Sequence, residues 1–178
     1  MNHKIIKIIN GFFFYLIWIG CIAGVRLNLF YLGPAITIFF IAVHLMVVEQ
    51  VKREIELIFF CLLLGGIVEG LFIYFGVLTY KGYFLLSSAL PPIWILCIWI
   101  TLSLTINYSM AFLKGRFYLT ILGGLIFGPW CYYVAMKSEV LYFHFPILQT
   151  ILILGLSWGA CLPIMYYINK KIGSRDGV

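Results

Sequence analysis

The stretch Leu57–Leu78, LIFFCLLLGGIVEGLFIYFGVL, places one carboxylate, Glu69, near the middle of an apolar run. It is long enough to cross a bilayer as a helix, which takes about 20 residues. A central acid costs about 3 kcal/mol on an insertion scale, and each Leu, Ile, Phe or Val returns roughly 0.3 to 0.6 kcal/mol. The stretch holds fifteen residues of these four types. Because together they return on the order of 6 kcal/mol, which outweighs the cost of the acid, we predict a transmembrane helix with Glu69 inside the membrane.

Helical spacing places Glu69 on a face rich in glycine. Positions three, four and seven residues away share its face, and they are Leu62, Gly65, Gly66, Phe72, Ile73 and Gly76. Since glycine lets a second helix come close, we expect a central helix packed through Gly65, Gly66 and Gly76. The carboxyl is then either a protonated hydrogen-bonding group or a site for a substrate, ion or proton. The cost of burying an acid favours the second interpretation.

The whole chain shares this apolar character. Of its 178 residues, 64% are hydrophobic and 10% are charged. Six stretches are long enough to span a membrane, at roughly 6–25, 29–48, 57–78, 91–112, 117–136 and 147–168. Little chain remains between them, so we expect an all-α integral membrane protein, a compact bundle of six transmembrane helices forming one domain over 1–178. The net charge of +6 then concerns membrane orientation, and we expect no nucleic acid partner.

Basic residues divide unevenly between the two sides that this topology creates. The amino end, the second and fourth loops and the carboxyl tail carry nine Lys and Arg residues, and the other side carries three, Arg26, Lys81 and Lys137. Short basic loops favour the cytoplasm. Both termini are therefore predicted to be cytoplasmic, in a multi-pass protein of the inner (plasma) membrane.

The other polar groups of the spans predict a ligand site. His44 and Asn107 fall in the cytoplasmic half of the bilayer, and Asn107 lies roughly 10 Å deep. Ser103 precedes Asn107 by four positions and shares its face, while Arg26 ends the first span at the outer edge. With Glu69 near mid-depth, we predict that Glu69, His44 and Asn107 can cluster, with Ser103 and Arg26 as further ligand-binding residues. A direct pair of Glu69 with Arg26 would need a tilted helix or a buried arginine.

The connections and the cysteines add no chemistry. The segment 49–56, EQVKREIE, reads as a solvated turn, and 79–90, TYKGYFLLSSAL, as an aromatic segment at the level of the lipid headgroups. All five cysteines fall inside spans without CxxC pairs or zinc spacing. We therefore expect no metal, no cofactor and no catalytic residue. GxxxG pairs in spans one, three, five and six favour close helix packing, within the chain or with a membrane protein partner.

The combined pattern resembles a family of short bacterial inner-membrane proteins catalogued as a domain of unknown function. The resemblance covers nearly the whole chain, on Trp18, Cys21, Gly33, Pro34, His44, Glu69, Pro92, Trp94, Asn107, Ser109, Gly128 and Pro129. The chain departs from the pattern at Glu69, where the family is expected to have Asp. The resemblance implies a helical membrane protein and no particular activity.

Three classes of function fit these observations. The first is binding or translocation of a membrane lipid or small amphipathic molecule at the polar intramembrane site. The second is an intramembrane lipid-modifying enzyme with Glu69 and His44 as acid and base. That class is weaker, because the chain has no HExxH, GxSxG, acidic pair or phosphate-binding loop. The third is a structural or accessory subunit of a membrane complex.

Overall fold

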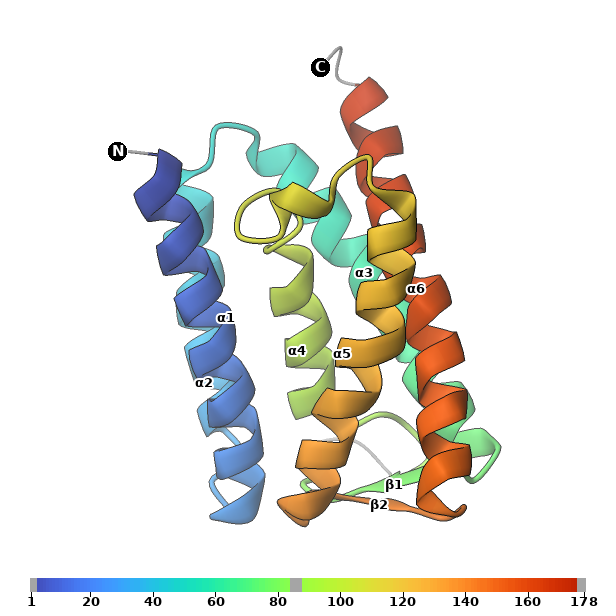
Figure 1. Ribbon diagram of the computed structural model, residues 1–178. Coiled ribbons are helices and arrows are strands. Elements are labelled where there is room, and N and C mark those ends of the chain that lie inside the picture. The colour runs from blue at the N-terminus through green and yellow to red at the C-terminus, as the bar shows by residue number, and fades with distance from the viewer. Residues whose placement is uncertain (1–2, 84–87, 176–178) are drawn as a thin grey trace.

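The computed structural model describes residues 3–83 and 88–175, which form a bundle of helices with a small sheet at one end. The elements are α1 (His3–Arg26), α2 (Leu32–Val47), α3 (Val51–Tyr74), β1 (Leu78–Tyr80), α4 (Ile93–Ser103), the 3₁₀ helix η1 (Ala111–Leu113), α5 (Phe117–Lys137), β2 (Leu141–Phe143) and α6 (Ile147–Arg175). Both termini lie at one face of the bundle, here the terminal face, and the strands lie at the other, the strand face (Figure 1). The strands pair antiparallel, with Thr79 opposite Tyr142.

Four of the described helices, α1, α3, α5 and α6, are long and apolar enough to cross a membrane. The shorter apolar helices α2 and α4 have 16 and 11 residues, fewer than the about 20 that a full crossing takes. The described part of the protein is thus all-helical apart from two short strands, and its helix lengths give four candidate membrane spans, against the six that the sequence predicted.

Helix α4 ends at Ser103, nine positions before the predicted end of its span at residue 112. The hydroxyl of Ser103 donates to the carbonyl of Ile100 at 2.6 Å, and that of Thr105 donates to Leu102 at 2.6 Å. Hydroxyls that bond to nearby backbone carbonyls compete with the helical pattern. The chain accordingly continues from 104 to 110 as a series of turns.

Asn10 of α1 satisfies the backbone where α4 stops. Its amide nitrogen donates to the carbonyl of Leu104 at 3.0 Å, and its oxygen accepts from the Ser109 hydroxyl at 2.7 Å. Asn10, Leu104 and Ile106 are all buried. Non-helical backbone at membrane depth is tolerated where protein surrounds it, so this broken segment is compatible with a membrane.

Helix α3 begins at Val51 and ends at Tyr74, whereas the sequence placed its span at 57–78. It ends in a Schellman motif: Gly76 has φ +61°, its N–H bonds to Ile73, and the N–H of Val77 bonds to Phe72. Only glycine adopts this left-handed backbone without strain. The helix is therefore shifted toward the terminal face, and residues 51–56, predicted as part of a solvated turn, belong to it.

The predicted packing of α3 is correct at one glycine of three. A Cβ on Gly65 would lie 2.4 Å from the ring of Trp99, whereas Gly66 and Gly76 face open space. The central helix is α4, which lies against α1, α2 and α3 and carries the fully buried Trp99 (Figure 1). Gly76 was misassigned because α3 ends two residues before it, and Gly66 because it follows Gly65 in the helix and so points about 100° away from the contact with Trp99.

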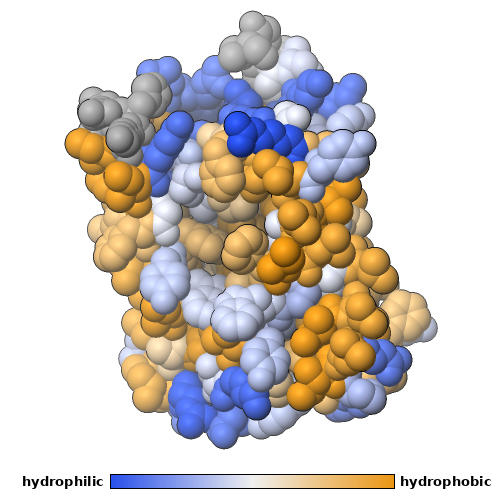
Figure 2. Space-filling model, viewed as in Figure 1, coloured by the Kyte–Doolittle hydropathy of each residue, from blue (hydrophilic) through white to orange (hydrophobic). Residues whose placement is uncertain are grey.

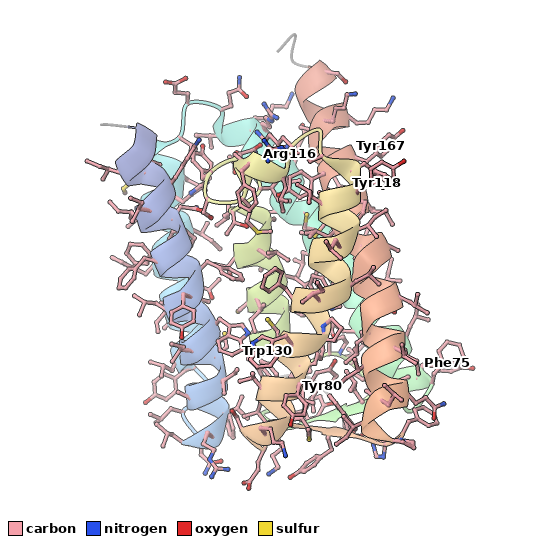
Figure 3. All side chains as sticks on the ribbon, in the orientation of Figure 1. Phe75, Tyr80, Arg116, Tyr118, Trp130 and Tyr167 are labelled. Carbon is pink, nitrogen blue, oxygen red and sulfur yellow. The ribbon has the colours of Figure 1, made fainter. Side chains whose placement is uncertain are left out.

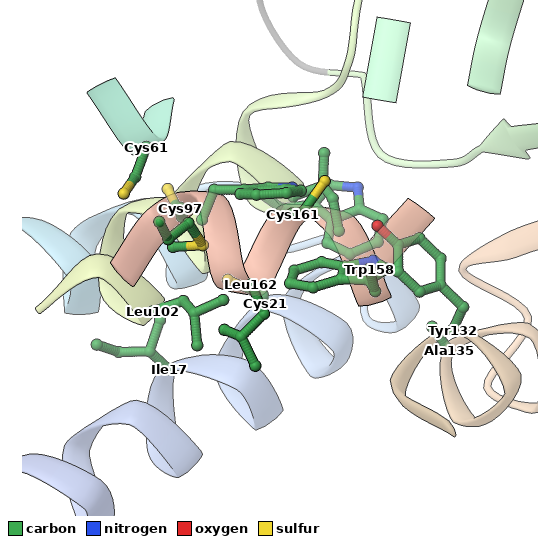
Figure 4. Close-up of a cluster of buried hydrophobic side chains, with 14 of the residues drawn as sticks. Ile17, Cys21, Cys61, Cys97, Leu102, Tyr132, Ala135, Trp158, Cys161 and Leu162 are labelled. Carbon is green, nitrogen blue, oxygen red and sulfur yellow. The ribbon is translucent and has the colours of Figure 1, made fainter. Parts of the chain in front are cut away.

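Glycines of the other GxxxG pairs pack helices of this same chain together. A Cβ on Gly124 would lie 2.1 Å from the Trp158 carbonyl oxygen, and one on Gly128 would lie 2.4 Å from the Trp158 ring. Helices α5 and α6 form the most extensive helix pair as a result. Trp158 belongs to a buried cluster with Tyr132 and Leu162 (Figure 4). Four of the five cysteines are also buried, and all five are unpaired, in keeping with their interpretation as apolar fillers.

Candidate functional site

Glu69 lies at the centre of a buried hydrogen-bond cluster, here the Glu69 cluster. The hydroxyls of Tyr80 and Tyr132 donate to its two carboxyl oxygens, and the indole N–H of Trp99 donates to Oε1 at 2.8 Å. Glu69 and Trp99 are fully buried, and the two tyrosines are at most 4% exposed. Among the described residues no cation pairs with Glu69. Three neutral donors from β1, α4 and α5 thus satisfy one carboxyl group, as a buried acid requires.

The way in which α3 ends brings Tyr80 into this cluster. The Schellman turn sends the chain directly into β1, whose last residue, Tyr80, points back into the bundle. The sequence predicted Tyr80 in an aromatic segment at the headgroup level and gave no sign that its hydroxyl is buried against Glu69. Tyr80 lies near the strand face (Figure 3). Phe84 of that predicted segment falls outside the described residues.

A second buried carboxylate, Glu54, organises a separate cluster near the terminal face, here the Glu54 cluster. His44 Nε2 lies 3.2 Å from Glu54 Oε2, and the amide of Asn107 donates to Oε1 at 2.8 Å. The amide of Asn169 in turn donates to Asn107 at 2.9 Å. Glu54 is 3% exposed. The cluster ties α2, α3, the 104–110 segment and α6 together.

The predicted grouping of Glu69 with His44 and Asn107 is therefore not found in the structure. Glu54 and Glu69 are separated by fifteen residues of α3, or about 22 Å at the rise of a helix. Because α3 begins at residue 51 and not at 57, Glu54 takes the place beside His44 and Asn107, and Glu69 lies nearer the strand face than mid-depth. Periodicity identified the polar residues and mispaired them.

Ser103 and Arg26 join neither cluster. The Ser103 hydroxyl bonds within its own helix. Arg26, the last residue of α1, pairs with Glu139, which follows α5, and both side chains are more than half exposed. Exposed ion pairs of this kind contribute about 0 to 1 kcal/mol. Arg26 does not pair with Glu69. The predicted depths of the two residues had already disfavoured such a pair.

An apolar groove of about 480 Å³ lies between α1, α4 and α5. Figure 2 shows it as a hollow in the face of Figure 1, with hydrophobic residues on its walls and hydrophilic residues gathered at both ends. Its wall includes Trp99 and Tyr132, the two ring systems whose polar atoms turn away from the groove to bond to Glu69. Its other lining residues are almost all apolar and include Phe14, Trp18, Ile22, Leu102, Leu113, Leu122 and Phe127. The Glu69 cluster thus supports one wall of the groove.

Two cations stand at the terminal end of the groove. Lys114 and Arg116 follow Leu113 and precede Leu119, which both line the groove, and Figure 3 shows Arg116 near the terminal face. Neither makes an ion pair in the part of the chain that the structure describes. Partial burial lowers the pKa of Lys114, and the nearby charges of Arg53 and Lys7 lower it further. Arg53 and Lys7 therefore repel the charge of Lys114, while Glu54 attracts it, and an anion beside Lys114 would stabilise its charged form.

Four functional candidates were missed from the sequence: Glu54, Tyr80, Trp99 and Tyr132. Glu54 was hidden by a helix boundary set six residues too late. The other three have a weaker signal that was present, since buried Tyr and Trp need a partner for their polar atom, and Glu69 was the acceptor in their neighbourhood. The groove has no periodic signal, because it is lined by residues of several helices that come together only in the fold.

Comparisons with known proteins add the family and no activity. No curated protein and no solved structure matches this chain. Residues 7–164 match a family described as a protein of unknown function (DUF2878). The match covers most of the chain and agrees with the resemblance derived from its motifs, so the chain belongs to the DUF2878 family.

Proposed function

We propose that this protein is a multi-pass inner-membrane protein that binds an anionic phospholipid, with an acyl chain in the groove and the phosphate at Lys114 and Arg116. The observation that carries the proposal is the groove itself, an apolar hollow of about 480 Å³ on the side of a membrane bundle. Pockets for small ligands have volumes of about 300 to 1,000 Å³. The groove is therefore of a size to bury an acyl chain.

The chemistry of the wall supports a hydrocarbon occupant. Trp99 and Tyr132 line the groove, while their donors are engaged by Glu69. A water molecule needs two to four polar partners, which this wall does not offer. The lipid tails of the surrounding bilayer are the most abundant apolar groups that could enter the groove. In this proposal Glu69 contributes to the site as a positioning residue, by fixing the two rings.

The charge at the end of the groove supports an anionic headgroup. Arg116 presents a guanidinium, whose planar donors match the oxygens of a phosphate. Lys114 lies two residues before Arg116 and directly follows η1. Each Lys or Arg near a membrane surface attracts anionic lipid by about 1 kcal/mol. Both cations also belong to the basic side of the chain, which supports cytoplasmic termini.

The same proposal includes six crossings with both termini in the cytoplasm. Termini at one face (Figure 1) require an even number of crossings, and the buried 104–110 segment lengthens the short crossing of α4. Reporter fusions after Tyr80 and at the carboxyl terminus are expected to report opposite sides of the membrane. Identical signals from the two fusions would overturn this topology.

The enzyme alternative loses its proposed acid and base pair, because Glu69 and His44 bond to different partners in separate clusters. An accessory role through GxxxG faces has less support than the sequence suggested, because fewer of these faces are free to bind a partner. The glycines of α5 that form such a pair are occupied by α6. Lipid binding is therefore the function that the geometry favours.

A groove-filling variant tests the proposal. A Cβ at Gly123, on the groove wall, would meet only Leu162 at 3.6 Å, so Gly123→Leu fills the groove without a clash at Cβ. Gly66→Leu is the matched control, because it adds the same side chain where nothing lies within 4 Å. In nanodiscs containing phosphatidylglycerol, native mass spectrometry is expected to find bound lipid on the wild type and on Gly66→Leu. Equal lipid retention by Gly123→Leu, or no lipid on the wild type, would overturn the proposal.

A further inference from the structure

The groove is longer than the chain of one lipid leaflet. Along α5 its lining runs from Leu119 to Ala135, sixteen residues or about 24 Å. The hydrocarbon core of a bilayer is about 30 Å thick, so one leaflet supplies about half of that. A phospholipid anchored at the terminal face therefore leaves the far part of the groove empty.

A second hollow continues the groove to the strand face. It has a volume of about 370 Å³ and shares Trp18 and Ile22 with the groove. Its remaining lining residues are Ile19, Ala23, Arg26, Val134, Lys137 and Ser138. The space between α1 and α5 thus extends over most of the bilayer thickness.

This second hollow also ends in cations. Lys137 is the last residue of α5, and Arg26 is the last residue of α1. Arg26 is neutralised by Glu139, whereas Lys137 lies 5.6 Å from the ring centroid of Tyr133 and makes no ion pair among the described residues. Among the described residues, one uncompensated positive charge therefore lines the second hollow, and two others, Lys114 and Arg116, lie near the terminal end of the groove.

We infer that Lys137 marks a second headgroup site, at which an anionic phospholipid of the opposite leaflet places its phosphate while its acyl chain meets the first chain near Trp18 and Ile22. This inference rests on the proposed function, because it assigns the far half of the same groove. A helix from a partner protein is the other occupant of this length. A helix about 10 Å wide and 24 Å long fills about 1,900 Å³, several times the volume of the groove.

Charge-removing variants in nanodiscs of phosphatidylcholine with a minor fraction of phosphatidylglycerol test the inference by native mass spectrometry. The wild type is expected to retain two phosphatidylglycerol molecules. Lys137→Gln should lower the occupancy of the second about five-fold, since one surface cation contributes about 1 kcal/mol. Lys81→Gln is the matched control, because Lys81 also lies at the strand face but lines neither hollow.

The double variant Lys114→Gln/Arg116→Gln separates the two proposals. It should lower the occupancy of the first lipid about thirty-fold, because two cations are lost. The second lipid should remain bound at Lys137. One lipid on the wild type, lost with this variant and unaffected by Lys137→Gln, would overturn the second site and leave the proposed function standing. No retained lipid on the wild type would overturn both. A copurified membrane protein displaced by Gly123→Leu, with no second lipid, would assign the groove to a partner helix and also overturn the second site.

Discussion

The two buried carboxylates of α3 have different partners, although they belong to one helix. Glu69, near the strand face, is held by two hydroxyls and an indole. Glu54, near the terminal face, is held by an imidazole and an amide. The donors of Glu69 are large aromatic side chains, two of which line the groove, and the partners of Glu54 are smaller polar side chains on two neighbouring segments. The first cluster therefore shapes the groove, and the second fastens the end of the bundle.

This difference teaches what a buried acid contributes in each place. The Glu69 cluster is fully buried, so a donor that loses its partner there cannot bond to water instead and costs free energy. The Glu54 cluster lies beside Arg53, which bonds to Asn169 at 3.4 Å and to the exposed Gln50 at 3.1 Å. Water reaches the second cluster more readily when a partner is removed. The two acids should thus differ in how much stability their loss costs and in whether the groove is affected.

The largest expected effect is that of Glu69→Leu. It leaves three buried donors unsatisfied, each at about 1 to 3 kcal/mol, so the free energy of unfolding should fall by about 3 kcal/mol or more. The rings of Trp99 and Tyr132 would lose their fixed orientation, and lipid occupancy of the groove should fall with them. Unfolding by SDS titration in mixed micelles measures the first effect, and native mass spectrometry measures the second.

Glu69→Gln is the control for that substitution. Its amide keeps an acceptor for Trp99 and removes the charge, so stability should fall by only about 1 kcal/mol and lipid occupancy should persist. A Leu variant as stable as the Gln variant would show that the cluster does not support the groove. A Gln variant that folds but loses lipid would instead assign the charge of Glu69 a direct role.

Glu54→Leu should have a smaller effect and a different one. It leaves His44 and Asn107 without their acceptor, at about 2 kcal/mol after water reaches them, while the groove wall is untouched. SDS titration should therefore show a loss of stability without a loss of bound lipid. Glu54→Gln, which keeps the bond from Asn107, should lie between the wild type and the Leu variant. A loss of lipid in Glu54→Leu would mean that the two clusters are not distinct.

Much of this comparison could be predicted from the sequence, and the part that could not depends on one boundary. The apolar run identified α3 and the buried acid, and the glycine at 65 correctly marked a close contact with another helix. The apolar count began at Leu57, because Lys52, Arg53 and two acids lie before it. Hydropathy does not reveal that Glu54 turns inward while its charged neighbours turn to solvent. A helical count carried back to Val51 would place Glu54 and Leu57 three apart on one face.

The groove could not be predicted, for a different reason. The fourth apolar stretch has no proline or glycine after Pro92 to break it, and the break at Ser103 depends on hydroxyls that bond to their own helix and on Asn10 from α1. Such a contact joins residues almost a hundred positions apart. Local patterns predicted the crossing but not its interruption, and the groove is lined by residues of α1, α4 and α5 that come together only in the folded bundle.

Tyr132→Phe should have a modest effect that separates wall shape from hydrogen bonding. It removes one of the three donors to Glu69 and keeps the ring that lines the groove, so stability should fall by about 1 kcal/mol while lipid occupancy persists. Tyr80→Phe removes a donor outside the groove and should match it in stability. If Tyr132→Phe alone abolished lipid binding, the hydroxyl would contact the ligand, and the assignment of the wall as purely apolar would be wrong.

The smallest expected effect is the coupling between the two clusters, measured by a double-mutant cycle of Glu69→Leu and Glu54→Leu. The two sites share no partner and lie about 22 Å apart along α3, and substitutions more than 7 to 10 Å apart add within about 0.5 kcal/mol. The cycle of Glu54→Leu with Asn107→Leu is the reference, because these residues share a hydrogen bond of 2.8 Å and should couple by about 1 kcal/mol. SDS titration of the wild type, the three single variants and the two double variants gives both numbers. A coupling between Glu69 and Glu54 as large as that of the reference pair would join the clusters into one network, and the groove could then no longer be assigned to Glu69 alone.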